Sequence, residues 1–250
     1  SMNKTIVITG ASAGIGRALA QECFNRGYHL GLTGRRVDAL EALRTELLAS
    51  SPQAQQRIEL SALDVDDGDS VAPTLHSLFE RLGQVDVVVV NAGINQYSKV
   101  GRGDFSKERQ VLQTNLIGAI ATVNAAAEFF LGQGRGHIVG ISSLASLKGM
   151  PTQGAYCASK AGFSMYLDSA RIELKPKNIR ITKILPGFVV TDIMPNIEKF
   201  PFAVPAAQAS REMLDLIEKG RELGVVPGYP WRLLRPLIAH IPDGLWKKLM

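Results

Sequence analysis

Tyr156 and Lys160 could together exchange a proton with a bound molecule. They lie four positions apart in an amphipathic pattern over 153–174 that predicts a helix, so their side chains share one face. A tyrosine has an unperturbed pKa of about 10 and needs a value nearer neutrality for acid–base catalysis. An ammonium about 4 Å away, at an effective dielectric constant of about 20, contributes roughly 4 kcal/mol, enough to lower such a pKa by about three. We therefore expect Tyr156 to be a general acid or base whose pKa Lys160 lowers.

A serine hydroxyl and an asparagine amide are candidates to assist this pair. Ser143 lies 13 residues before Tyr156, at the end of a predicted strand, where it could hydrogen-bond a substrate oxygen as charge develops. Alternation along that strand places Ser142 on the opposite face. The alternatives are that Ser143 only caps a turn and that Asn115 only makes a hydrogen bond inside a predicted helix.

Three glycines in the segment TGASAGIG, Thr9 to Gly16, follow the first apolar run of the chain. They lie where a predicted strand meets a predicted helix, and a helix N-terminus offers unpaired N–H groups and a partial positive charge to a pyrophosphate. Gly10 could turn tightly, Gly14 could let phosphates approach, and Gly16 could let the helix pack on the strand. The alternative is a tight turn without a ligand, which the strand–helix–strand context disfavours.

Short apolar runs alternate with amphipathic stretches along most of the chain. The runs predict strands buried on both faces of a sheet, at 4–9, 28–33, 57–63, 85–90, 136–142 and 179–185. The stretches between them predict helices at 14–26, 37–49, 69–82, 106–131 and 153–174. The alternation predicts an α/β fold: a Rossmann-like, doubly wound parallel sheet with helices on both faces, in a single domain with an extended C-terminal tail.

The bulk properties of the 250-residue chain argue against several classes of protein. A net charge of +5, without a nucleic-acid-binding motif or a basic stripe with interleaved aromatics, predicts a solvated basic surface and no nucleic-acid partner. The two cysteines, Cys23 and Cys157, have no disulfide or metal-ligand spacing, so we expect no metal. We see no signal peptide and no run of about 18 apolar residues, and we expect a cytoplasmic protein. Ser1 resembles a residue left by a removed tag.

The order of its motifs makes the chain resemble the short-chain dehydrogenase/reductase family. After T-G-x-x-x-G-x-G come, in this order, NAG at Asn91–Gly93, QTNLIG around Asn115, ISS ending at Ser143, YCASK at Tyr156–Lys160 and PGFVVT at Pro186–Thr191. The resemblance covers about residues 4–195. It implies a nicotinamide cofactor and hydride transfer between that cofactor and a carbonyl or secondary alcohol.

The resemblance also implies roles for individual residues. The catalytic positions would be Asn115, Ser143, Tyr156 and Lys160, with Asn115 steadying a water that links Lys160 to solvent and Lys160 also holding the nicotinamide ribose. The cofactor-binding positions would be Gly10, Ser12, Gly14, Ile15, Gly16, Arg35, Arg36, Asp64, Val65, Asn91, Ala92, Gly93, Tyr156, Lys160, Pro186, Gly187, Val189 and Thr191.

The end of the second predicted strand favours NADP(H) over NAD(H). NAD sites usually carry an acidic residue there for the ribose 2′-OH, but this chain reads LTGRR, with Gly34 followed by Arg35 and Arg36. Arginine suits a phosphate through its planar set of donors, and the Ser12 hydroxyl could add to it. The alternative is that the two arginines merely begin an exposed helix.

The last part of the chain departs from the pattern of the family. We expect a catalytic domain over 2–228, with a substrate loop at about 192–204, and an apolar and basic tail over 229–250. Prolines limit the tail to short helical pieces after a strand near 223–226. The tail could cover the substrate pocket, pack on a second subunit or lie on an anionic membrane; we expect packing near the substrate loop rather than membrane contact.

Substrate class and assembly follow from apolar residues. Side chains after Thr191 could line an apolar pocket for a small to medium carbonyl compound or simply pack on the sheet: Ile193, Met194, Ile197, Phe200 and Phe202.

Apolar positions on the helices at 106–131 and 153–174 predict at least a homodimer: Ala125, Ala126, Phe129, Phe130, Phe163 and Tyr166. The alternatives are a reductase of polar, sugar-like substrates and a catalytically idle NADP(H)-binding regulator or scaffold.

Overall fold

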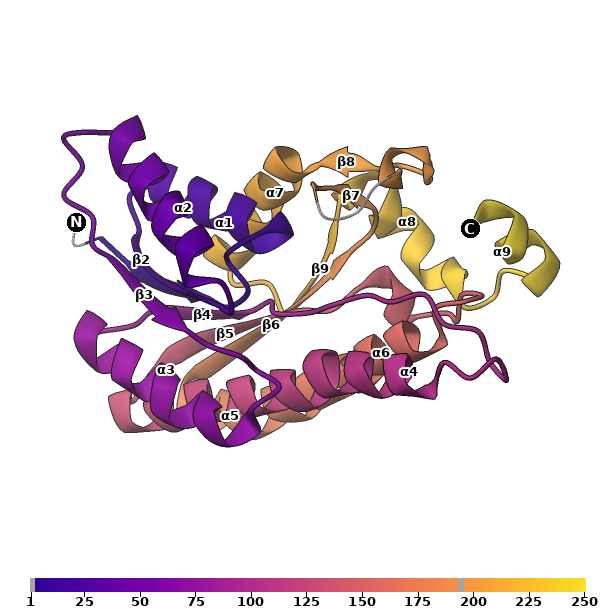
Figure 1. Ribbon diagram of the computed structural model, residues 1–250, viewed down its shortest axis with the longest axis horizontal. Helices are drawn as coiled ribbons and strands as arrows, with labels where there is room; N and C mark the ends of the chain where they lie inside the picture. The colour runs from indigo at the N-terminus through magenta and orange to yellow at the C-terminus, as the bar shows by residue number, and fades with distance from the viewer. Residues whose placement is uncertain (1–2, 193–195) are drawn as a thin grey trace.

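A seven-stranded parallel sheet forms the centre of the protein, as the computed structural model shows for residues 3–192 and 196–250 (Figure 1). Its strands, in spatial order, are β3 (Ile58–Ala62), β2 (His29–Gly34), β1 (Thr5–Ile8), β4 (Val87–Val90), β5 (Gly136–Ile141), β6 (Ile179–Pro186) and β9 (Leu223–Val226). The chain order reverses between β1 and β4, and ligands of such sheets bind at that point, beyond the carboxyl ends of the strands.

Helices cover both faces of the sheet (Figure 1). One face carries α1 (Gly14–Asn25), α2 (Val37–Ser50) and α7 (Ala206–Glu218). The other face carries α3 (Gly68–Leu82), α4 (Phe105–Leu112), the π-helix η1 (Gln113–Gly118), α5 (Ala119–Gln133) and α6 (Gly154–Leu174). This arrangement confirms the predicted doubly wound α/β fold.

Two apolar cores, one on each face of the sheet, hold these layers together. The strands supply both, because successive side chains of a strand point to opposite faces: Val87 and Val89 pack under α1, whereas Val88 and Val90 pack under α3 and α5. All four side chains of β4 are buried, which is why this strand reads as a continuous valine run. Packing on both faces holds the carboxyl edge of the sheet in place, and the candidate site lies at that edge.

The long helix over Phe105–Gln133 differs from its sequence prediction in two ways. Its middle, η1, is a π-helix, and π-turns of this kind are frequent at functional sites. By length and composition the helix could cross a membrane, which the sequence analysis did not predict. Its apolar side chains pack against α3, where the Phe79 and Phe129 rings are 4.9 Å apart, and this packing accounts for the composition.

Most of the residues that predicted a dimer lie in the core instead. Ala125, Ala126, Phe130 and Phe163 are fully buried between the helices and the sheet, so they cannot contact a second subunit. The exposed apolar side chains of α5, α6 and η1 are different ones: Ile117, Leu131, Met165 and Ile172. The prediction of a dimer stands on these four residues rather than on the buried ones.

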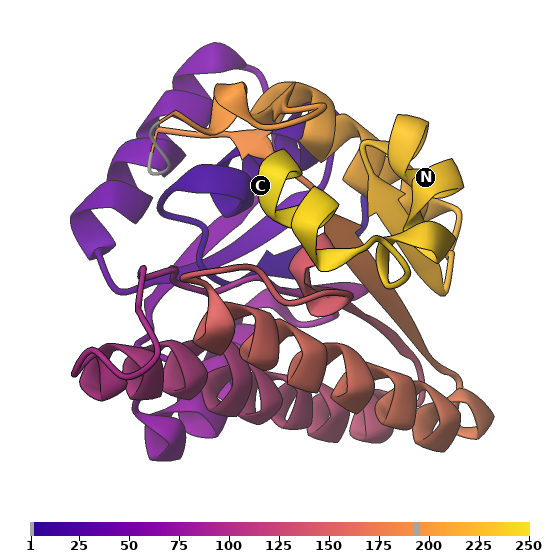
Figure 2. The ribbon, with the colours of Figure 1, turned by 90° about the vertical axis from the view of Figure 1, so that its right-hand side faces the viewer.

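Residues 196–205 and 228–250 lie together over the carboxyl edge of the sheet (Figure 2). A small parallel pair joins β7 (Val189–Val190) to β8 (Val204–Pro205), and η4 (Ile197–Lys199) lies between them in the chain. The tail supplies α8 (Gly228–Ile238) and α9 (Asp243–Leu249), which confirms the strand near 223–226 and the short helices that the prolines predicted. The helix α7 was not predicted from the sequence.

Candidate active site

In the glycine-rich turn between β1 and α1, the backbone packs directly against its own chain and against the segment after β4. Gly10 and Gly14 have positive φ values of 62° and 59°, which favour glycine, and a Cβ on Gly10 would lie 2.8 Å from Ala92 Cα. A Cβ on Gly16 would overlap the Gly10 carbonyl oxygen. The first residue before α1 is Ala13, whose side chain cannot cap the helix, so the N–H groups of the first turn are available to an anion.

Thr9 and Asn91 tie this turn to the segment after β4. Thr9 Oγ1 accepts hydrogen bonds from the backbone N–H of Asn91 at 2.9 Å and of Ala92 at 3.3 Å. Asn91 Nδ2 donates to the carbonyls of Thr9 at 3.2 Å and Gly10 at 3.3 Å. The two segments therefore form one rigid floor at the reversal point of the sheet.

The end of β2 presents two arginines beside the glycine turn. A Cβ on Gly34 would lie 3.2 Å from Ser12 Oγ, so this position sits directly against the turn. Arg35 and Arg36 are exposed and line the same cavity as Ser12 and Asp64. The two guanidinium groups therefore place positive charge in this part of the cavity, beside the glycine turn.

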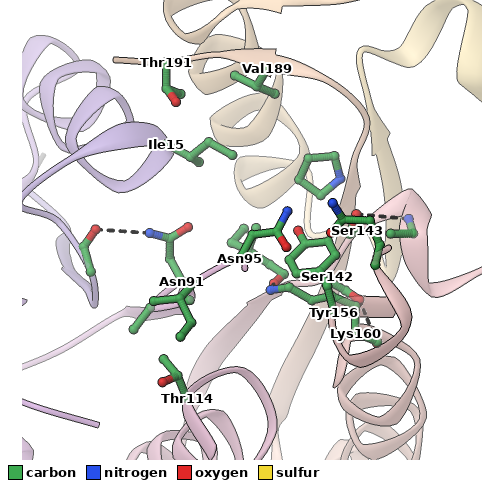
Figure 3. Close-up of a pocket in the computed structure, with 18 of the residues that line it drawn as sticks. Ile15, Asn91, Asn95, Thr114, Ser142, Ser143, Tyr156, Lys160, Val189 and Thr191 are labelled. Atoms are coloured by element: carbon green, nitrogen blue, oxygen red, sulfur yellow. Dashed lines mark hydrogen bonds between the residues drawn. The ribbon is translucent and has the colours of Figure 1, made fainter. Parts of the chain in front are cut away.

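Ser143, Tyr156 and Lys160 meet at the carboxyl end of β5 (Figure 3). Lys160 Nζ donates to the Ile141 carbonyl at 3.1 Å and lies 5.9 Å from the centre of the Tyr156 ring. Ser143 Oγ accepts from the backbone N–H of Ala145 at 3.0 Å, so it both caps η2 (Leu144–Ser146) and faces the cavity.

The neighbouring Ser142 points into α6 rather than toward this group. Its hydroxyl donates to the Lys160 carbonyl at 3.1 Å and lies 2.6 Å from Ser164 Oγ. The alternation expected along the strand is confirmed.

Loss of hydration shifts the pKa values of Lys160 and Tyr156 when no cofactor is bound. It lowers the pKa of Lys160 to about 8, because the ammonium loses hydration. It also raises the pKa of Tyr156, and the nearby Ser143 hydroxyl only partly offsets this rise. In the protein without a bound cofactor the pKa of Tyr156 is therefore raised rather than lowered, because desolvation outweighs the Ser143 hydrogen bond. A role of Lys160 in lowering that pKa stays a prediction.

Asn115 lies within the π-helix and clamps the segment after β4. Its Nδ2 donates to the Ile94 carbonyl at 2.7 Å, and its Oδ1 accepts from the Ile94 N–H at 2.8 Å. A Cβ on Gly93 would lie 3.3 Å from Asn115 Oδ1 and 3.7 Å from Lys160 Nζ, so Gly93 lies close to both side chains. The amide thus bonds a separate segment and not its own helix; its role toward a water stays a prediction.

One cavity of about 870 Å³ joins these parts. Figure 3 shows Ser143, Tyr156 and Lys160 on one side of it and Ile15, Val189 and Thr191 facing them from the other. The expected site residues line the cavity except for Gly14, Gly16 and Asn115, which support its walls from behind.

The tail closes the end of the cavity beyond the reacting group. Trp231, Ile238, Trp246 and Met250 line it together with Leu144 and Phe188. The ring of Trp231 meets Phe202 edge-on at 5.6 Å, which confirms that the tail packs near the substrate loop.

The apolar residues expected to line a pocket have different fates. Ile197 and Phe200 line the cavity, and Phe200 stacks on Phe188 at 4.6 Å. Phe202 is half exposed and packs on the tail. Ile193 and Met194 lie outside the described residues.

Several polar residues of the cavity escaped the sequence analysis, among them Asn95, Gln153 and Trp231. Asn95 Oδ1, Gln153 Oε1 and Trp231 Nε1 are buried without a hydrogen-bond partner. Asn95 and Gln153 flank recognised motifs, two residues after NAG and three before Tyr156, so a search of motif neighbours could have found them. Trp231 has no such signal, because only the folded tail brings it here.

A doubly wound parallel sheet with a glycine turn at its reversal point, joined by one cavity to a tyrosine–lysine pair, defines a nucleotide-binding oxidoreductase. The family model for short chain dehydrogenases matches residues 4–201. The chain belongs to this family.

Relatives and solved structures agree with this assignment. An uncharacterized oxidoreductase of Myxococcus xanthus is 35% identical over 93% of this chain and 90% of its own length. An uncharacterized oxidoreductase of Mycobacterium tuberculosis is 33% identical over 97% of this chain and 96% of its own. Among solved structures, an alcohol dehydrogenase from the archaeon Thermococcus sibiricus, complexed with 5-hydroxy-NADP, has a TM-score of 0.79 and 28% identity, covering 89% of this chain and 94% of that one.

Proposed function

We propose that this protein is an NADP(H)-dependent oxidoreductase acting on a carbonyl or secondary alcohol of small to medium size and largely apolar character. The observation that carries the proposal is the single cavity that has two arginines at one end, Tyr156 and Lys160 at its middle and an apolar wall at the other. A phosphorylated dinucleotide and an apolar substrate would meet there at the tyrosine.

The residues present fit a dinucleotide. The backbone is open where phosphates would lie, because Gly10 and Gly16 have no room for a side chain and α1 begins without a side-chain cap. Arg35 and Arg36 favour a 2′-phosphate over a bare hydroxyl. The NADP derivative bound to the Thermococcus sibiricus enzyme supports this choice. An enzyme from Burkholderia phymatum, 22% identical with a TM-score of 0.83, was solved with NAD, so the fold alone does not decide between the two.

Each polar side chain of the middle part has a separate task in carbonyl reduction. A bound NADPH would supply the hydride for the carbonyl carbon. Tyr156 gives its proton to the carbonyl oxygen, and the Ser143 hydroxyl hydrogen-bonds that oxygen while negative charge develops on it. Lys160, held by the Ile141 carbonyl, places its ammonium beneath the tyrosine ring and assists its reprotonation. In oxidation the same tyrosine takes the proton from the alcohol.

Asn115 acts by positioning. Its two hydrogen bonds to Ile94 hold the chain after Gly93, and that chain packs against Lys160. Neutral hydrogen bonds of this kind contribute about 1 kcal/mol each, enough to fix a loop in one conformation.

A substrate screen tests the proposal. The purified protein would be mixed with NADPH and a panel of ketones, aldehydes and sugars, and NADPH consumption followed by absorbance, with NADH as the matched control. We expect turnover with apolar carbonyl compounds and a clear preference for NADPH. Turnover confined to sugars would support the polar-substrate alternative, and NADPH binding without any turnover would support the idle regulator.

A further inference from the structure

The tail gives the cavity an apolar wall, and Trp231 and Gln153 add one unpartnered polar atom each to the lining. Ile238, Trp246 and Met250 from the tail form much of that wall. Among the described residues that line the cavity, the cations are Lys160 in the middle and Arg35 and Arg36 at the opposite end. A substrate that occupies the far end must therefore be neutral there, because a carboxylate would find no countercharge.

Trp231 brings an unused hydrogen-bond donor into this wall. Its side chain is 5% exposed, and its Nε1 has no partner although the atom is buried. The other tryptophan of the same wall differs: Trp246 Nε1 donates to the Gly149 carbonyl at 2.8 Å. Buried polar groups in proteins are nearly always hydrogen-bonded, so an orphaned donor in a ligand cavity indicates a ligand acceptor.

Gln153 brings an unused acceptor to the same region. Its residue is 9% exposed, and its Oε1 is also buried without a partner. Its backbone is fixed, because its N–H donates to the Met150 carbonyl at 3.1 Å and its own carbonyl accepts from Cys157 at 2.8 Å. The amide therefore stands at the start of α6, three residues before Tyr156.

Both groups line the cavity that holds Tyr156. A Cβ on Gly187 would lie 2.7 Å from Trp231 Nε1, and Met150, which accepts from the Gln153 N–H, packs against the cluster that contains Trp231. Leu144, next to Ser143, packs in the same cluster as Trp231. An unpartnered donor and an unpartnered acceptor thus line the same cavity as the tyrosine.

We propose that the substrate carries a neutral hydroxyl near its reacting carbonyl, which accepts from Trp231 Nε1 and donates to Gln153 Oε1. This deepens the proposed function and rests on it. A hydroxyl satisfies both orphaned atoms, whereas a second carbonyl satisfies only the tryptophan. The remainder of the substrate is apolar, to match the surrounding side chains. Hydroxyketones, and the diols formed from them, are the substrate class with this chemistry.

The test compares two substrates within each variant, so that a general loss of activity affects both values of kcat/KM and leaves their ratio unchanged. Cyclohexanone and its ring-hydroxylated isomers would be reduced with NADPH by the wild type, Trp231→Phe, Gln153→Leu and Trp246→Phe. We expect the wild type to prefer one hydroxylated isomer over cyclohexanone by at least about tenfold in kcat/KM. Trp231→Phe and Gln153→Leu should each remove most of that preference, measured as the ratio of kcat/KM for the two substrates within the same variant.

Trp246→Phe is the matched control, because it changes the other tryptophan of the wall, whose N–H is already bonded within the protein. It should keep the preference. A wild type without preference for any hydroxylated isomer would overturn the inference, as would an unchanged preference in Trp231→Phe. Reduction of cyclohexanone alone would leave the proposed function intact while this inference failed, so the two failures are distinct.

Discussion

The ammonium of Lys160 lies 5.9 Å from the centre of the Tyr156 ring, with Lys160 buried and Tyr156 partly buried beside the carboxyl end of β5. Burial works against the charged form of each, so the protein alone keeps the tyrosine protonated and draws the pKa of the lysine down to about 8. A protonated tyrosine is the form that reduction of a carbonyl requires. Oxidation requires a further positive charge nearby, which the oxidised nicotinamide would carry.

Arg35→Asp should reverse the cofactor preference. The change removes the donors expected to hold a 2′-phosphate and places a repelling carboxylate there. We expect kcat/KM for NADPH to fall by about a hundredfold and that for NADH to change little or rise. Arg44→Asp, on the helix α2 that follows Arg35 and Arg36 but outside the cavity lining, is the control. Equal losses with both cofactors in Arg35→Asp would refute the assignment.

His137 should make the protein sensitive to acid. The residue is 9% exposed, its Nε2 lies 2.7 Å from Thr182 Oγ1, and burial together with Arg180 and Lys4 lowers its pKa to about 4. In the unfolded chain its pKa is about 6.5, so the unfolded state binds more protons between these values and stability falls as the pH drops from about 6.5 to about 4. The loss amounts to about 3 kcal/mol.

Denaturant titrations of the wild type and His137→Gln over that pH range measure this effect. The variant should start less stable at neutral pH and lose about 3 kcal/mol less on acidification. His240→Gln, which changes an exposed histidine, should follow the wild type. Parallel curves for the wild type and His137→Gln would show that the buried imidazole plays no part.

A homodimer should form through the exposed apolar side chains of the α5–α6 face. Met165 and Ile172 are 67% and 68% exposed on α6, and a two-fold mate would bury both. The double change Met165→Glu with Ile172→Glu should weaken dimerisation at least about tenfold in sedimentation equilibrium. Leu48→Glu, on α2 at the other side of the sheet, should have no effect. A monomeric wild type at micromolar concentration would contradict this prediction.

The tail should control substrate binding and not cofactor binding. Deletion of residues 229–250 removes the apolar wall, so it should raise KM or change the substrate range while NADPH affinity is kept. Because the deletion also uncovers buried side chains, Trp246→Ala offers a milder test, with Leu249→Ala on the same helix as control. We expect KM to rise several-fold in Trp246→Ala alone. Unchanged kinetics in a folded deletion variant would remove this role, and binding of the intact protein to anionic vesicles would favour the membrane alternative.

The sheet and the motif positions could be predicted from the sequence because they depend on local patterns. The valine run of β4 requires burial on both faces, and the glycines of the first turn are required by backbone contacts that only glycine allows. The π-helix around Asn115 could not be predicted, since nothing in its apolar spacing differs from an α-helix. The same holds for the direction of the Tyr156 pKa, which depends on how completely the fold excludes water.

The substrate end of the site was the least predictable part. Trp231 and Gln153 are 78 positions apart, and only the folded tail brings both into one cavity. Of the apolar tail residues expected to leave water, Trp231, Ile238 and Trp246 are buried. The expectation is wrong for four leucines, which remain exposed: Leu233, Leu237, Leu245 and Leu249. Which side chains are buried depends on long-range contacts such as that of Trp231 with Phe202.

Removal of the Tyr156 hydroxyl tests the central claim most directly. Lys160→Ala should weaken both turnover and NADPH binding, because the lysine is assigned two tasks, and it is measured beside Tyr156→Phe. In Tyr156→Phe the ring still packs and only the exchangeable proton is lost, so kcat should fall by about a thousandfold while the NADPH dissociation constant, measured by calorimetry, stays that of the wild type. A Tyr156→Phe enzyme that keeps most of its kcat would contradict the account.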